Sequence, residues 1–286
     1  GQGLPSAKLQ PGMQLVMVTD GLFAKLYGSS SGDDGGPGFI SSDAFKSLKR
    51  LFPDADFRGN IFFATDIHGS EVCWRKFLNA GAFHKADVLV MGGDMTGKAM
   101  VPIVSRNGSW TLRLQDQDYV LTSEDEVQAM EKRIADRGYY PIRLTTDEVA
   151  AWESDLALVD TRFKAEMVGM VERWMALADE RLKGKGIRCI VSPANDDIFD
   201  LDQIIAAAEL VDLGEQNTIE LDGFTMVSTG WANPTPWNTF RELPEDQLRS
   251  RIDELVAAIP DKRRTIFNFH APPYGSNLDN APKLDA

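Results

Sequence analysis

Four short apolar segments constrain the fold most, because each has the composition of a buried β-strand. They lie at residues 59–64, 86–91, 188–192 and 265–269. A helical pattern at 71–80 separates the first two, and strand, helix and strand at this spacing are typical of the βαβ unit of a parallel sheet. Further helical patterns at 161–182 and 245–258, with a pair of strands around 218–228, continue the alternation. The sequence therefore predicts an α/β fold.

The alternation of strands and helices is interrupted at residues 101–160. Asn107-Gly108 is a strong signal for a β-hairpin, and 122–137 has a helical pattern with Ser123 as its capping residue. We interpret 101–160 as a hairpin and helical segment inserted on top of the core. Its aromatic residues either line a pocket or form a small core within the insertion; they are Trp110, Tyr119, Tyr139 and Tyr140.

The opening part of the chain has a different composition. An apolar run at 13–19 is compatible with a strand, and 28–38 has the composition of a flexible Gly-rich linker. A helix capped by Ser42 is expected over 42–51. We therefore divide the chain into an N-terminal segment with its linker, 1–38, which is only loosely tied to the rest, and one domain, 39–286.

Composition narrows the classes of partner. The 286 residues carry 30 Lys and Arg against 43 Asp and Glu, a formal net charge of −13. General nucleic-acid binding and binding to an anionic membrane both need a basic surface, so neither is expected. No segment reaches about 18 consecutive apolar residues, which excludes a membrane-spanning helix. The two cysteines, Cys73 and Cys189, favour a reducing compartment, and we expect a cytoplasmic protein.

Each of the four apolar segments is followed by polar side chains that can bind a metal. In open α/β sheets the carboxyl ends of the strands form the ligand-binding crevice, so these groups are expected to converge. In Asp66-Ile67-His68, a carboxylate and an imidazole two residues apart can share one cation. The glycines before Asp94 allow a tight turn that leaves this carboxylate able to bridge two cations. The other two clusters are Asn195-Asp196-Asp197 and His270.

In this order and strand context, the clusters over 59–270 resemble the signature of the calcineurin-like metallophosphoesterases. That signature reads Asp-x-His, Gly-Asp, Gly-Asn-His followed by Asp or Glu, a further His, and Gly-His-x-His. The resemblance implies a sandwich of two mixed β-sheets flanked by helices, with a two-metal site at one sheet edge. It also implies a set of metal ligands: Asp66 and His68 on one metal, Asn195 and His270 on the other, and Asp94 between them.

The resemblance implies a metal-dependent enzyme that hydrolyses a phosphomonoester or phosphodiester through a hydroxide activated by two divalent cations. Mixed His, Asp and Asn ligands suit manganese, iron and zinc alike. Lys98 is expected to help neutralise the phosphoryl oxygens, and Asp197 to orient a ligand. Asp196 occupies the position of the histidine that protonates the leaving group in the family.

The sequence departs from the family pattern in two places. Asn195-Asp196 replaces the usual Asn-His pair, with Ala194 in place of Gly, although a subset of the family has Asn-Asp-Asp here. The histidines of the chain are His68, His84 and His270, so Gly-His-x-His is absent. We therefore expect the segment with this motif to lie after Ala286 or on a second polypeptide. His84, in the loop before the strand at 86–91, is expected to be structural.

Two alternatives remain open from the sequence. The first is a catalytically impaired scaffold with the phosphoesterase fold, or a fragment that needs another segment. The second is a nucleotide hydrolase, because Gly92–Lys98 matches the Gly-x-x-x-x-Gly-Lys phosphate loop. Ala99 follows Lys98, where that loop needs a Ser or Thr hydroxyl for magnesium.

Overall fold

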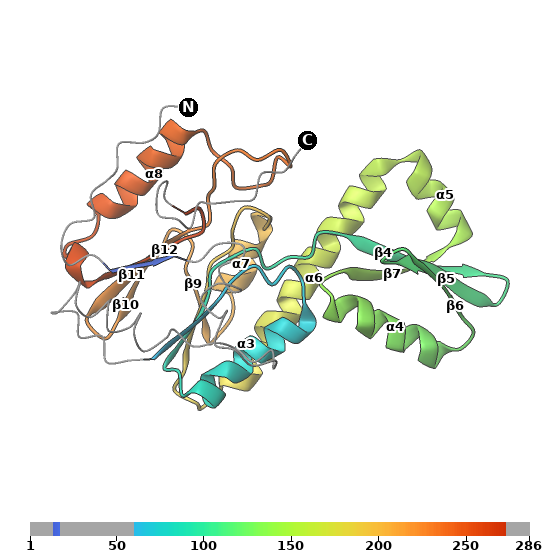
Figure 1. Ribbon diagram of the computed structural model, residues 1–286, viewed down its shortest axis with the longest axis horizontal. Coiled ribbons are helices and arrows are strands. Elements are labelled where there is room, and N and C mark those ends of the chain that lie inside the picture. The colour runs from blue at the N-terminus through green and yellow to red at the C-terminus, as the bar shows by residue number, and fades with distance from the viewer. Residues whose placement is uncertain (1–13, 18–59, 273–286) are drawn as a thin grey trace, which may run out of the picture.

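The computed structural model describes residues 14–17 and 60–272, which contain three four-stranded sheets with helices around them (Figure 1). We name them sheets A, B and C. The predicted helix at 42–51 and the linker at 28–38 lie outside the described residues. The fold is α/β, as the sequence predicts.

Sheet B is the parallel centre of the fold. It consists, in spatial order, of β2 (Ile61–Ala64), β3 (Val88–Met91), β8 (Arg188–Val191) and β9 (Val211–Leu213). All of its described ladders are parallel. β3 is apolar and buried throughout, and so is β8 after its exposed first residue, Arg188, as expected of parallel strands covered on both faces. The strands predicted at 59–64, 86–91 and 188–192 are therefore confirmed.

Sheet A is mixed. Its strands, in spatial order, are β1 (Gln14–Met17), β12 (Thr265–Phe269), β11 (Phe224–Thr229) and β10 (Thr218–Leu221). β10 and β11 form the predicted strand pair and run antiparallel, whereas β11 with β12 and β1 with β12 run parallel. The four residues of β1 thus belong to a core sheet, which corrects the expectation that the opening segment is only loosely tied to the domain.

The two core sheets pack face to face. Val88, Val90 and Ile190 of sheet B meet Met226 and Ile266 of sheet A in one apolar cluster. The outer faces are covered by helices: α3 (Glu71–His84), α6 (Leu156–Leu182) and α7 (Asp200–Ala206) on sheet B, and α8 (Glu245–Ala257) beside sheet A (Figure 1). A single-turn 3₁₀ helix, η1 (Lys262–Arg264), precedes β12.

The long helix α6 anchors the outer layer because its apolar residues recur every three or four positions. Its buried residues include Met167, Met170, Trp174 and Ala178. Trp174 stacks on Trp74 of α3 with ring centroids 4.9 Å apart, and the indole N–H of Trp74 donates to the Trp174 carbonyl at 3.3 Å. These contacts hold α3 and α6 together on sheet B.

Sheet C occupies most of the region interpreted as an insertion. Its strands, in spatial order, are β6 (Gln117–Leu121), β5 (Ser109–Leu114), β4 (Met100–Arg106) and β7 (Tyr140–Thr145). Two helices accompany it, α4 (Glu124–Asp136) and α5 (Thr146–Ser154). Among the described residues, sheet C shares no ladder with sheets A and B, and it stands to one side of them (Figure 1).

The local signals of this region match the structure. Asn107 and Gly108 form the two-residue turn between β4 and β5 with φ of 51° and 80°, and Ser123 caps α4 by accepting from the Glu126 N–H. Trp110 and Tyr119 pack on a separate apolar cluster of sheet C, whereas Tyr140 belongs to the main core. The predicted boundary at residue 160 falls inside α6.

No helix among the described residues is both long and apolar enough to cross a lipid bilayer. Cys73 lies on α3 and is exposed, Cys189 lies on β8 and is buried, and neither forms a disulfide.

Candidate metal centre

The candidate site lies where four parallel strands of the core sheets end. Asp66 follows β2 by two residues, Asp94 follows β3 by three, Asn195 follows β8 by four, and His270 directly follows β12. The first three come from sheet B and His270 comes from sheet A. The site is therefore built across the edge at which the two packed sheets meet.

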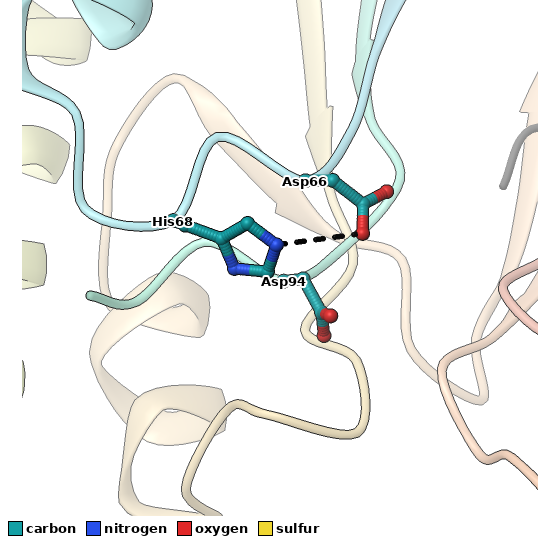
Figure 2. A group of neighbouring side chains, drawn as sticks. All are labelled: Asp66, His68 and Asp94. Carbon is teal, nitrogen blue, oxygen red and sulfur yellow. Dashed lines mark ion pairs between the residues drawn. The ribbon is translucent and has the colours of Figure 1, made fainter. Parts of the chain in front are cut away.

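Asp66, His68 and Asp94 form the metal-competent group of the described residues. One potential ligand atom from each lies within 4.8 Å of the other two. His68 Nε2 is 3.8 Å from Asp66 Oδ1, longer than a hydrogen bond, and the Asp94 carboxylate lies below the same imidazole (Figure 2). Ligand bonds of about 2.0–2.2 Å place two donors of one cation roughly 3–3.5 Å apart, so a small inward shift would let these groups share an ion.

The backbone at these three residues is unusual. Asp66, His68 and Asp94 have φ of 55°, 41° and 49°, in the left-handed region that residues other than glycine rarely occupy. Other such residues in the described chain include Lys85 after α3 and Asn107 in a hairpin turn, where this conformation is ordinary. Left-handed backbone at three adjacent polar side chains is typical of functional sites.

Hydrogen bonds between the two loops hold this backbone in place. The N–H groups of Asp66, His68 and Gly69 donate to the carbonyls of Gly93, Asp94 and Met95 at 2.9, 3.0 and 2.6 Å. The loop after β2 is thus paired with the loop after β3, although neither is a strand there. This pairing fixes the three metal-competent side chains relative to one another.

Gly93 is required by close approach of the loops. Its φ is 120°, and a Cβ atom there would lie 2.2 Å from the Ala194 Cβ and 3.1 Å from His270 Nδ1. Gly230 also lies against this segment, since a Cβ there would lie 2.5 Å from the Ala194 Cα. Ala194 fits because the two residues that approach it most closely here, Gly93 and Gly230, have no side chain.

His270 joins the group through Asp94. Its Nε2 lies 3.5 Å from Asp94 Oδ2, and its Nδ1 lies 3.3 Å from the Gly92 carbonyl. Burial alone would lower the pKa of His270, but the hydrogen bond and charge of Asp94, with the charge of Asp66, raise it to about 9. Burial would raise the pKa of Asp94, and the hydrogen bond and charge of His270 outweigh this and hold the pKa below its ordinary value.

Asp196 and Lys98 form a charged pair beside the group. Lys98 Nζ lies 2.9 Å from Asp196 Oδ2, the same oxygen lies 3.8 Å from His68 Nδ1, and the Asp196 N–H donates to Asp94 Oδ1 at 3.1 Å. Burial first, and then the charge of Asp94, raise the pKa of Asp196, although Lys98 opposes the shift. The lysine is mostly exposed, so the pair stands between the buried carboxylates and solvent.

Asn195 is oriented by a segment that the sequence did not indicate. Its amide Nδ2 donates to the Thr239 hydroxyl at 3.0 Å, and its backbone carbonyl accepts from the Phe240 N–H at 2.9 Å. Because an amide nitrogen cannot bind a cation, the bond to Thr239 sets which end of the amide remains for a ligand role. Nothing in the local sequence around Thr239 predicts this contact.

Asp197 connects two site loops through backbone groups and the Thr96 hydroxyl, and its predicted role in orienting a ligand stays a prediction. Its buried carboxylate accepts from the N–H groups of Ala194, Met95 and Thr96 at 2.8, 3.0 and 3.0 Å, and from the Thr96 hydroxyl at 2.9 Å. The carboxylate therefore ties the loop after β8 to the loop that carries Asp94.

The structure also bears on two side chains outside the group. A phosphate-binding P-loop needs a helix directly after its lysine, but Lys98 is followed by β4, so the structure does not support the nucleotide-hydrolase alternative. His84 is the last residue of α3 rather than part of a loop, and its ring stacks on Phe62 with centroids 5.3 Å apart. It lies outside the metal-competent group.

Comparison with known proteins adds little to this geometry. No family model matches the chain, and no curated protein matches it. A solved crystal structure resembles it with a TM-score of 0.43 and 13% sequence identity, over 75% of this chain and 70% of the other.

Proposed function

We propose that this protein is a metal-dependent phosphoesterase whose site is centred on Asp94. The observation that carries the proposal is the convergence of Asp66, His68 and Asp94 within 4.8 Å at the carboxyl ends of parallel strands. An imidazole and two carboxylates form a donor set that suits manganese, iron and zinc. Their left-handed backbone, held by hydrogen bonds between the loops, supports a functional rather than a structural role for this group.

Asp94 is the residue best placed to serve two cations. Asp66 and His68 lie on one side of its carboxylate, and His270 contacts it from the other sheet. Asp66 and His68 would hold one divalent cation, and His270 with Asn195 a second, with Asp94 shared. Two such cations lower the pKa of a bound water and neutralise charge that develops on the phosphoryl oxygens.

The remaining polar groups have distinct roles in the proposed reaction. Water gives up one proton to solvent and adds to phosphorus as hydroxide, and the bond from phosphorus to the leaving oxygen breaks. That oxygen takes a proton from Asp196 in its protonated form, and solvent then restores the proton of Asp196. The ammonium group of Lys98, beside Asp196 and open to solvent, balances negative charge on the phosphoryl group. Asp197 holds the loop after β8 against the Asp94 loop, so the two halves of the site keep their spacing.

The proposal does not extend to nucleic acids as general partners. The formal net charge of −13 opposes binding to a long polyanion, because such binding draws its affinity from a basic surface. A small phosphomonoester or phosphodiester carries few charges, and the bound cations would offset them locally.

Hydrolysis of a phosphoester panel tests the proposal. The purified chain is loaded separately with Mn²⁺, Fe²⁺ and Zn²⁺ and assayed against aryl, alkyl and nucleoside phosphomonoesters and phosphodiesters. We expect hydrolysis that stops on chelation, and loss of most of it in Asp94→Asn. Asp118→Asn, which removes an exposed carboxylate on β6, is the matched control and should retain full activity.

Two results would contradict the proposed function. Wild-type activity in Asp94→Asn with metals retained would remove Asp94 from the reaction. Little bound metal together with no turnover of any phosphoester would favour the scaffold alternative instead.

A further inference from the structure

Exposed aromatic side chains lie on two chain segments that are bonded to the candidate metal centre. Four large aromatic residues are strongly exposed in the described chain: Phe83 at 79%, Phe199 at 49%, Trp237 at 70% and Phe240 at 41%. Phe83 lies on α3, but the other three follow strand ends at the site edge. Phe199 comes two residues after Asp197, and the other two lie on residues 231–243, which we call the aromatic loop.

The aromatic loop is attached directly to the site. The N–H of Phe240 donates to the Asn195 carbonyl at 2.9 Å, and the Thr239 hydroxyl accepts from the Asn195 amide at 3.0 Å. The neighbouring Asp196 donates its N–H to Asp94. Phe240 is therefore separated from the central carboxylate by one short segment of backbone.

A buried arginine fixes the base of the loop. Arg241 donates from Nε to the Asp197 carbonyl at 3.2 Å and forms a two-pronged ion pair with Asp202 at 2.6 and 3.2 Å. Its guanidinium lies 4.7 Å from the centre of the Phe199 ring. Phe199 in turn contacts Trp231 at the start of the loop, with ring centroids 5.8 Å apart.

The tip of the loop is also held rigidly. The Glu242 carboxylate accepts from the N–H and hydroxyl groups of both Thr235 and Thr239, on either side of Trp237. Asn238 adopts a left-handed φ of 56° between them. These internal hydrogen bonds fix the backbone on both sides of Trp237, whose side chain is exposed to solvent.

We infer that the aromatic loop is a recognition site for the organic group of the substrate, and that this group is a planar aromatic ring joined to the phosphoester. The inference rests on the proposed function, because it assigns the phosphoryl group to the metal centre. Rigid aromatic side chains bind planar rings by stacking, at little cost in conformational entropy. Aryl phosphoesters and nucleotides share this chemistry. The acidic chain favours a small molecule over a polynucleotide.

Binding of phosphonates, which are not hydrolysed, tests the inference apart from turnover. Isothermal titration calorimetry in the presence of Mn²⁺ compares methylphosphonate, phenylphosphonate and the phosphonate analogue of adenosine 5′-monophosphate. We expect wild-type protein to bind phenylphosphonate about tenfold more tightly than methylphosphonate, which corresponds to about 1.4 kcal/mol. If the nucleotide analogue binds more tightly than phenylphosphonate, the ring of the substrate is a nucleobase. If it binds more weakly, the substrate is an aryl ester.

Substitutions test whether the aromatic loop causes the preference for phenylphosphonate over methylphosphonate. Trp237→Ala and Phe240→Ala should each lower the ratio of phenylphosphonate to methylphosphonate affinity several-fold, whereas Phe83→Ala, on α3, should leave it at the wild-type value. An equal affinity for both phosphonates in wild type, or an unchanged ratio in both loop variants, would overturn the inference and leave the proposed function intact. Failure of all phosphonates to bind would overturn both.

Discussion

Asp94 Oδ2 lies 3.5 Å from His270 Nε2, and this contact joins a strand end of sheet B to a strand end of sheet A. A site that spans two sheets keeps its geometry only if the sheets keep their spacing. The apolar cluster between the sheets and the hydrogen bonds between the strand-end loops supply that rigidity. Changes to these loops should therefore affect both stability and the site.

Gly93→Ala tests the close packing of two loops against the centre. A Cβ at Gly93 would overlap the Ala194 Cβ, and its φ of 120° is strained for alanine, so we expect a loss of about 3 kcal/mol or more in the free energy of unfolding. Gly108→Ala also has a positive φ, 80°, but nothing lies within 4 Å, so it should lose only about 1 kcal/mol. Urea unfolding measures both.

The double variant Gly93→Ala/Ala194→Gly separates overlap from strain. It removes the clashing methyl group and should recover part of the loss, which a double-mutant cycle would report as a favourable coupling. Strict additivity of the two changes would show that the contact with Ala194 is not the cause.

Removal of the Asp197 carboxylate should destabilise the protein strongly. Asp197→Ala leaves the N–H groups of Ala194, Met95 and Thr96 without their acceptor in a fully buried place, at a cost of about 3 kcal/mol or more. Asp118→Ala, on the exposed face of β6, should change the free energy of unfolding by less than about 0.5 kcal/mol. Similar denaturation midpoints for the two variants would refute the connecting role of Asp197.

Glu215 should make stability depend on pH. Burial raises its pKa to about 7, against the hydrogen bond from the Gly230 N–H and the charges of Arg241 and Arg251, with Asp202 adding to the rise. In the unfolded chain the pKa is about 4.3. Between these values only the unfolded chain loses the proton, so the free energy of unfolding should fall by about 3 kcal/mol as pH rises from about 4.3 to 7.

The Glu215→Gln variant isolates this effect. It keeps an acceptor for the Gly230 N–H but cannot ionise, so the stability difference between wild type and variant should change over this pH range. In Glu209→Gln, at an exposed position, the free energy of unfolding should depend on pH as it does in wild type. If the free energy of unfolding depends on pH in the same way in wild type and in Glu215→Gln, then the pKa of Glu215 is the same in the folded and the unfolded chain.

Asp196→Asn tests the proposed proton donor. Loss of this proton donor should slow the hydrolysis of substrates with poor leaving groups, such as alkyl phosphoesters, by about 100-fold. It should slow the hydrolysis of activated aryl esters far less. The readout is the ratio of kcat/KM values for the two substrate classes. An equal decrease for both classes would remove Asp196 from this role.

Most of the core strands, the longer helices and the strand-end clusters were predictable because their signals are local. The buried apolar runs, the Asn107-Gly108 turn and the Ser123 cap each depend on a few neighbouring residues, and the structure confirms them. The approach of Asp66, His68 and Asp94 followed from the rule that parallel strands end at one edge.

The features that the sequence did not indicate depend on contacts between residues far apart in the chain. β1 lies beside β12, and β7 joins β4 to complete sheet C, with Met100 opposite Tyr140. The attachment of Asn195 to Thr239 across 44 positions has no local signature either. Contacts of this kind, between loop residues far apart in the sequence, cannot be predicted from local sequence patterns and are identified only in the folded structure.

Mn²⁺ binding tests the central claim most directly. Electron paramagnetic resonance titration of the purified chain counts bound Mn²⁺ in wild type, His68→Ala, Asp94→Asn and Asp118→Asn. The account predicts bound Mn²⁺ in wild type and in Asp118→Asn, and affinity at least about tenfold lower in His68→Ala and Asp94→Asn, since loss of a direct ligand should cost no less than loss of a group that orients one. Equal Mn²⁺ affinity in all four proteins, or none in wild type, would contradict a metal centre at Asp66, His68 and Asp94.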